Sequence, residues 1–179
     1  MIEFEEAVST PENWLRQAWQ LLEAAKALYQ SMDGMRLPKT EAETYREVGS
    51  MKGIMLLLGL AVENALKGAL VYKFPPDTSG GRLRSSHFQG NGRQHDLVAI
   101  AQRMKFPISD EYRPLLERLS IFVQWASKYQ VPLRKSEQKK ASGNLYLRPP
   151  TDIKLVEALI TDLQSYAGFD NDDGWPIPR

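Results

Sequence analysis

The most strongly apolar stretch of the chain spans residues 49–73, GSMKGIMLLLGLAVENALKGALVYK. Its Leu, Ala and Met content and its lack of proline favour an α-helix, and apolar residues occupy nearly every face of that helix. A helix that is apolar all round is covered by other helices, so we expect this segment to be the central helix of the fold. A cap signal at Thr40 begins a helix that could lead directly into it. Gly49 and Gly53 leave open whether one helix or two form.

Four further segments show apolar residues at helical spacing, each preceded or begun by residues suited to a helix N-terminus. They are residues 11–32, 95–104, 110–128 and 151–166. We expect Ser9 and Thr10 to cap the first of them and Ser109 the third. No segment alternates convincingly as a β-strand does, and the chain has no internal repeat. The sequence therefore predicts an all-α, up-and-down helical bundle of four to five main helices with two long loops.

The two predicted loops, residues 74–94 and 129–150, are the candidate functional segments. Loops longer than about 12–15 residues in a compact domain tend to be functional or disordered. Net charge over the whole chain is only +1, but residues 74–93 hold three Arg and one Asp, and residues 128–150 hold six Lys or Arg and one Glu. The two segments together carry +7 and the rest carries −6. If they meet in space they form a basic patch; the simpler interpretation is that solvated loops carry solvating charges.

Length and composition indicate one soluble domain. A chain of 179 residues with 42% hydrophobic residues is long enough for a single core, so we expect one domain over residues 1–179, with its core at about 11–168 and flexible ends. The chain has no cysteine, which excludes disulfides and thiolate chemistry and fits a reducing cytoplasm. The N-terminus is acidic and lacks a secretory pattern, and the longest apolar run, residues 54–62, is too short to span a bilayer. We expect a cytoplasmic protein with no membrane partner.

The usual motifs for cofactor binding and catalysis are missing. The chain contains no G-x-G-x-x-G, Walker loop, H-E-x-x-H or G-x-S-x-G, and it has only two histidines. A His-rich metal site is therefore excluded. A carboxylate metal site is also not expected, because the central helix offers only Glu63 and no Glu-x-x-His. We expect neither a metal nor a cofactor.

Four features in order along the chain resemble the HEPN superfamily (higher eukaryotes and prokaryotes nucleotide-binding). They are GLAVENALKGAL on the central helix, a Gly-rich loop, a His-Asp-Leu at the start of a short helix, and LLERLSIFVQWASKY on the next helix. In that family a Glu-x-x-x-Lys pair precedes the His-Asp-Leu, and one subgroup ends its fourth helix with Trp-x-x-Arg-Tyr-Pro. The residues at these positions are Glu63, Lys67, His95, Asp96, Leu97, Trp125, Lys128 and Tyr129, with Lys128 in place of Arg and Gln130 in place of Pro. The resemblance covers about residues 51–132.

The resemblance implies a helical domain that often dimerises through its bundle, so we expect a homodimer. It also implies that catalytic relatives are metal-independent ribonucleases, which carry an Arg followed a few residues later by a His late in the bundle. The corresponding region here, ERLSIFVQWASKYQ, contains Arg118 but no His. Arg82 and His87 show the spacing, but they lie in the Gly-rich loop, where backbone freedom would not hold them for catalysis. The sequence therefore favours binding over catalysis.

We expect the chain to bind the phosphate groups of RNA or of a nucleotide around His95, through Arg82, Arg84, Arg93 and the segment 134–140, in a toxin–antitoxin or defence context. The candidate ligand-binding residues are Glu63, Lys67, Arg82, Arg84, His87, Arg134 and Lys135. If the chain cleaves RNA, the candidate catalytic residues are His95 and Arg93, because attack by a 2′-OH needs a base and a cation, and both residues precede a helix.

Other interpretations remain open for these residues and for the whole chain. His95 could cap its helix and bond Glu63 across the core, which is the interpretation we favour. Glu63 and Lys67 could form an ordinary intrahelical pair, and Trp125 and Tyr129 could belong to core and bundle-end packing. The whole chain could be a non-catalytic protein-interaction or regulatory module with a protein partner, or, as a second alternative, a metal-independent endoribonuclease.

Overall fold

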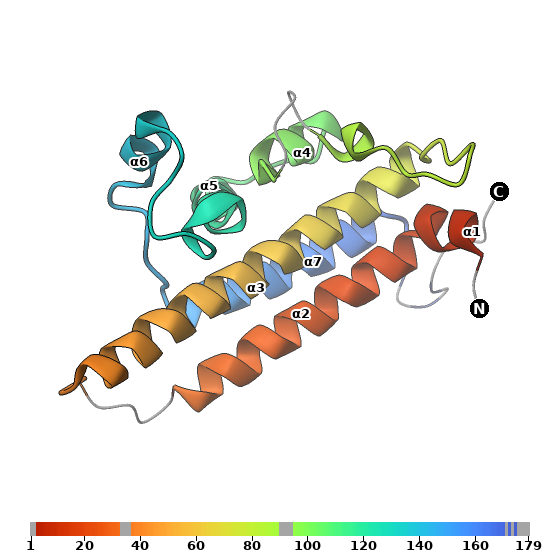
Figure 1. The fold of residues 1–179 in the computed structure, drawn as a ribbon. Coiled ribbons are helices and arrows are strands. Elements are labelled where there is room, and N and C mark those ends of the chain that lie inside the picture. The colour runs from red at the N-terminus through yellow and green to blue at the C-terminus, as the bar shows by residue number, and fades with distance from the viewer. Residues whose placement is uncertain (1–2, 33–36, 90–94, 171, 173, 175–179) are drawn as a thin grey trace.

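The computed structural model describes residues 3–32, 37–89, 95–170, 172 and 174. Its architecture is an all-α bundle in which α3 (Glu41–Lys73) runs through the middle (Figure 1). α2 (Pro11–Ser31) lies antiparallel to α3, and α7 (Thr151–Tyr166) lies along both. α4 (Leu97–Arg103) and α5 (Tyr112–Ile121) pack on another side of α3. The predicted central helix is thus confirmed, and so is the all-α bundle.

α3 is one continuous helix of 33 residues, which answers the question that Gly49 and Gly53 left open. The Thr40 side chain accepts a hydrogen bond from Glu43 N, and the Glu43 carboxylate accepts one from Thr40 N, so a capping box fixes its start. Residues 41–49 are exposed, and continuous burial of one face begins at Ile54. The long helix therefore has a polar, solvated first third and an apolar core segment.

By length and composition, α3 could also cross a membrane, and it is the one helix among the described residues of which this is true. Its most apolar 18-residue window has a mean hydropathy of 1.7, but 72% of that window is buried inside the fold. The other helices already cover its apolar surface, as they do for the core helix of a soluble protein.

Four shorter elements complete the described fold, and the sequence pattern predicted none of them as separate elements. They are α1 (Phe4–Ser9), a 3₁₀ turn (Ser85–Phe88), a π-helical turn (Phe122–Ala126) that continues α5, and α6 (Lys135–Ala141). The predicted loop of residues 129–150 thus contains a helix. Only Ala141 of α6 is buried, so α6 has no apolar stripe that a periodicity argument could find.

The prediction that a Thr10 side-chain hydrogen bond caps α2 was wrong. Thr10 stands at the N-cap position, but its hydroxyl donates to the Glu6 carbonyl at 2.6 Å and makes no capping bond. The reason is that α1 ends directly before it, and the hydroxyl satisfies a carbonyl of that helix instead. The N-cap position of α5 is Glu111, which makes no side-chain capping bond, but the Ser109 hydroxyl accepts a hydrogen bond from Tyr112 N at 3.2 Å, as was expected of it.

A buried ion pair ties α5 to the start of α7. Arg118 is 1% exposed and Asp152 is fully buried, and the Arg118 guanidinium lies 2.5 Å from Oδ1 of Asp152. The second carboxylate oxygen accepts a hydrogen bond from Arg148 N at 2.7 Å. Arg118 also stacks on the Tyr146 ring, with its guanidinium carbon 4.4 Å from the ring centroid. Arg118 therefore holds the fold together and is shielded from any ligand.

Gly59 allows the π-helical turn to approach α3 closely. A Cβ atom built at Gly59 would overlap Cγ2 of Val123 and would lie 3.4 Å from the Leu119 carbonyl oxygen. Val123 is β-branched and buried, so it has little freedom to move away. This contact positions the turn that contributes Gln124 and Trp125 to the candidate site described below.

We expect Gly59→Ala to destabilise the protein by about 1–3 kcal/mol, because overpacking at Val123 outweighs the gain in helix propensity. Gly49→Ala is the matched control in the same helix, since a Cβ atom at that position would have no other atom within 4 Å. It should stabilise by about 0.5–1 kcal/mol. Urea unfolding followed by circular dichroism measures both, and equal effects of the two substitutions would contradict the close approach.

Candidate functional site

The centre of the candidate site is Glu63, a carboxylate on α3 that is only 3% exposed. His95 Nδ1 lies 3.0 Å from Oε1 and 2.9 Å from Oε2, and Lys67 Nζ lies 2.7 Å from Oε1. Burial alone would raise the pKa of Glu63, but the hydrogen bond from His95 and the charge of Lys67 outweigh it and hold the pKa below its usual value. The structure thus brings three of the predicted site residues together.

His95 is held in place by its backbone as well as by Glu63. Its φ is +63°, a left-handed conformation that is uncommon outside glycine, and its carbonyl accepts a hydrogen bond from Gln124 Nε2 at 3.3 Å. The cap of α4 is Asp96, whose side chain accepts a bond from Ala99 N at 3.1 Å. The predicted bond between His95 and Glu63 is therefore confirmed, whereas the prediction that His95 caps the helix is wrong.

His95 faces a cavity of about 410 Å³ between the end of α5 and α6, which we call the His95 cavity. Its lining residues are His95, Gln124, Trp125, Tyr129, Leu133, Arg134, Ser136, Glu137 and Lys140. The Glu63 bond occupies Nδ1 of His95, so in the neutral ring the proton lies on Nδ1 and Nε2 carries the lone pair. The cavity thus combines an oriented imidazole with two cations, Arg134 and Lys140, and one carboxylate, Glu137.

Other predicted residues lie outside the His95 cavity. Lys67 Nζ lies 5.3 Å from the Phe88 ring centroid, at the 3₁₀ turn that also carries His87. Arg82 and Arg84 are exposed in the segment that leads to this turn. The cavity is not lined by Lys67, Arg82, Arg84 or His87, and it is not lined by Lys135, the first residue of α6. Of the predicted cationic ligands, the cavity therefore contains Arg134. Arg93 lies outside the described residues.

His87 is more firmly held than a loop position suggests. Nη1 of Arg103 donates to the carbonyls of Ser86, His87 and Gln89 at 3.2, 2.6 and 2.9 Å, which fixes the 3₁₀ turn. Burial lowers the pKa of His87, and the Arg103 charge lowers it further. Such a histidine is neutral at physiological pH and packs edge-on against Phe88 with ring centroids 5.0 Å apart. The expectation that backbone freedom leaves it loose was wrong.

The structure adds residues that sequence reasoning missed or interpreted differently. Gln124 was not singled out, and its signal is a lone amide within the apolar run that follows α5; Lys140 was expected only as the end of the basic segment 134–140. Tyr129 was expected to be a packing residue, but it is 59% exposed and lines the cavity. Trp125 is 9% exposed, in line with core packing, yet its remaining exposed surface also faces the cavity.

In comparisons with protein-family models, with curated proteins and with solved structures, nothing matches this chain. The HEPN resemblance therefore stays a prediction that depends on the residues quoted for it. Within the described ranges, no group of three or more His, Asp or Glu side chains is arranged to hold a metal ion.

The pH dependence of stability should reveal the Glu63 cluster. Because the folded pKa of Glu63 lies below its unfolded value of about 4.5, its contribution is complete above that pH and is lost as the pH falls through the folded pKa. Glu63→Gln should lower the free energy of unfolding by about 1–3 kcal/mol at pH 7, and its difference from wild type should shrink below pH 4.5.

The matched control for that measurement is Glu12→Gln, which removes an exposed carboxylate paired with Arg16 at 2.6 Å. An exposed pair of this kind contributes about 0–1 kcal/mol, so this variant should resemble wild type throughout. A Glu63→Gln deficit that stays constant down to about pH 3 would contradict the depressed pKa.

Proposed function

We propose that this chain binds the phosphate groups of RNA or of a nucleotide in the His95 cavity. The observation that supports this most strongly is that one concave site combines an oriented histidine with Arg134 and Lys140, while Trp125 and Tyr129 line the same walls. A guanidinium matches two phosphate oxygens and an ammonium supplies a point charge, and aromatic side chains provide surfaces on which bases stack.

The charge of the surrounding segment supports the same proposal. Residues 128–150 carry six Lys or Arg and one Glu, and they comprise α6 and the connections on both sides of it. α6 stands off the long helices beside the end of α5 (Figure 1), and two cations of this segment, Arg134 and Lys140, line the cavity. A cationic cleft of this kind attracts polyanions at long range.

Cross-linking locates the proposed site directly. A short single-stranded RNA irradiated with the protein should attach to peptides that contain Trp125, Tyr129 or the segment 133–140, because Trp125, Tyr129 and five residues of that segment line the cavity. Mass spectrometry of the digested complex identifies the attached peptide. Cross-links confined to α2 or α7 would place the RNA elsewhere and would contradict the proposal.

A metal-independent ribonuclease is the second candidate, and the Glu63–His95 geometry favours it. A carboxylate that holds Nδ1 and leaves Nε2 available is the arrangement of an oriented general base, and Arg134 or Lys140 could stabilise charge developing on phosphorus. A general base contributes about 10²–10⁴-fold, so His95→Ala should abolish cleavage while the helical spectrum stays unchanged. Wild-type protein that cleaves neither structured nor single-stranded RNA would rule this candidate out.

The remaining proposals concern the family of the protein, its location, its oligomeric state and the system in which it acts. We propose a HEPN-like cytoplasmic protein that acts as a homodimer in a toxin–antitoxin or defence system. Sedimentation that shows only monomer at micromolar concentration would contradict the dimer.

A non-catalytic interaction module is the alternative function, favoured by Val131 and Leu133, which are large, apolar and exposed beside the cavity. One stoichiometric protein partner without nucleic acid in a pull-down from the native host would favour that alternative.

A further inference from the structure

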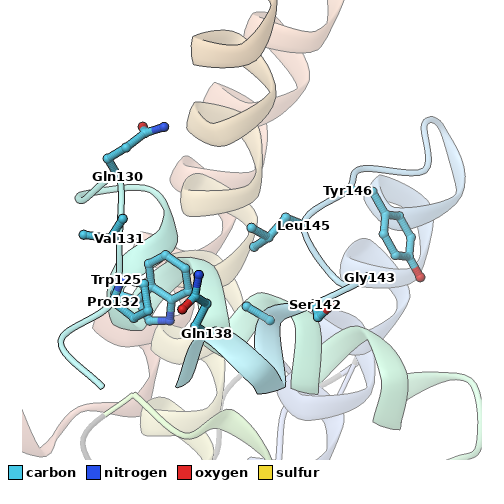
Figure 2. A pocket seen from close by; sticks show the side chains of 10 residues that line it. Trp125, Gln130, Val131, Pro132, Gln138, Ser142, Gly143, Leu145 and Tyr146 are labelled. Atoms are coloured by element: carbon cyan, nitrogen blue, oxygen red, sulfur yellow. The ribbon is translucent and has the colours of Figure 1, made fainter. Parts of the chain in front are cut away.

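A second cavity, of about 500 Å³, lies on the other side of α6. Six of the residues that line it are Trp125, Gln130, Val131, Pro132, Gln138 and Leu145, and every residue that lines it is uncharged. Figure 2 shows the side chains of Trp125, Pro132 and Gln138 together on one side, while Leu145 projects towards the middle from the opposite side. This neutral cavity has apolar walls and amide groups, unlike the cationic His95 cavity.

The two cavities form parts of one surface. Trp125 lines both of them. α6 contributes Glu137 and Lys140 to the His95 cavity, and it contributes Gln138 and Ala141 to the neutral one. Residues that are neighbours along one short helix therefore face the two cavities in turn. A ligand that fills both must have an anionic group close to an uncharged, flat group.

We infer that the neutral cavity binds an unpaired nucleobase whose phosphate is bound in the His95 cavity. This inference rests on the proposed phosphate-binding function and names the class of ligand for it. A nucleobase has apolar faces, which the Trp125 and Leu145 walls can cover, and a polar edge, which the Gln130 and Gln138 amides can bond as donors and acceptors. The volume of about 500 Å³ lies in the range of small-molecule sites.

The inference excludes a duplex as the preferred ligand. In double-stranded RNA the bases are stacked and paired, so their faces and edges are not available to a cavity. Single-stranded RNA and free nucleotides both present a nucleobase beside a phosphate. An uncharged peptide side chain would also fit the neutral cavity, but it would leave the adjacent cations, Arg134 and Lys140, unused.

The test compares a fluorescently labelled single-stranded RNA of about ten nucleotides with the same strand annealed to its complement, by anisotropy. We expect wild type to bind the single strand about tenfold more tightly than the duplex. The variant Gln138→Ala/Leu145→Ala should bind the single strand about tenfold more weakly and the duplex with unchanged affinity, because one base contact is removed.

Two controls accompany this test. Gln138 and Leu145 are both exposed, so the variant should still fold, and circular dichroism checks this. Gln102→Ala/Leu37→Ala, which alters exposed residues elsewhere, is the matched control.

The outcomes separate this inference from the proposed function. Equal affinity for duplex and single strand, with no effect of the Gln138→Ala/Leu145→Ala variant, would overturn the nucleobase site and leave phosphate binding intact. No binding of either RNA at low salt would overturn both. Competition by nucleoside 5′-monophosphates but not by ribose 5-phosphate would support the inference with a free nucleotide as ligand. Selective binding of the single strand without such competition would support it with a strand as ligand.

Discussion

Asp152→Ala should cost about 3–5 kcal/mol of folding free energy, the largest loss of stability that we expect from a single substitution. Asp152 is fully buried and Arg118, its partner, is 1% exposed, so truncation leaves a guanidinium charge buried without a counter-charge. The backbone N–H of Arg148 also loses its acceptor. Urea unfolding monitored by far-ultraviolet circular dichroism measures the loss.

A double variant separates the ion pair from the packing around it. Arg118→Met/Asp152→Ala removes both charges, and it should recover much of the stability lost in Asp152→Ala, because no uncompensated charge remains. The exposed pair of Arg16 and Glu12 is the control, and Glu12→Ala should change stability by less than about 1 kcal/mol. A loss below about 1 kcal/mol in Asp152→Ala, or a double variant no better than the single one, would contradict the buried pair.

Helix-terminal signals made most of the fold predictable from sequence. The cap at Thr40 and the Ser109 hydroxyl just before α5 are local devices, because their hydrogen bonds join residues only a few positions apart. Such devices can be recognised in a single sequence. α6 could not be recognised, because one buried residue gives no apolar stripe. The π turn was also not predictable, since its apolar residues continue the helical periodicity of α5.

The candidate site was only partly predictable, and the reason is sequence distance. Glu63 and His95 are 32 residues apart, and their bond was expected only as the simpler of two interpretations of His95. The segment 134–140 was predicted from charge alone, without any indication that it would form a helix whose Lys140 lines the same cavity as Arg134. A helix was expected over residues 151–166, and α7 forms there, but the burial of Asp152 against Arg118 depends on the packing of α5 on α7.

Neutralising the two cations of the His95 cavity should weaken RNA binding about 30- to 150-fold near physiological salt, since each charge-assisted phosphate contact contributes about 1–1.5 kcal/mol. The variant is Arg134→Gln/Lys140→Gln, which removes two positive charges from lining residues that are exposed and not required for the core. Anisotropy of a labelled single-stranded RNA measures the change, and it should affect different sequences nearly equally.

The control for this variant removes the same charge elsewhere. Lys39→Gln/Arg113→Gln changes net charge by the same amount, and both residues are exposed, just before the start of α3 and near the start of α5. This control variant should retain nearly all of the RNA affinity, because the two charges that it removes act on RNA only through the long-range electrostatic field of the protein. Equal losses in the two double variants would show that RNA responds to net charge alone and would contradict a site at the His95 cavity.

The salt dependence of RNA affinity tests the central claim most directly. If phosphates bind to the cations of the His95 cavity, the logarithm of the association constant should fall linearly with the logarithm of salt concentration, by about 0.7 per phosphate contact for a single strand. Wild type should therefore show a steep slope, and Arg134→Gln/Lys140→Gln should show a slope shallower by about 1.4. An RNA affinity that does not change between 50 and 200 mM salt (about a fourfold range), or an identical slope in the variant, would contradict phosphate binding at this site.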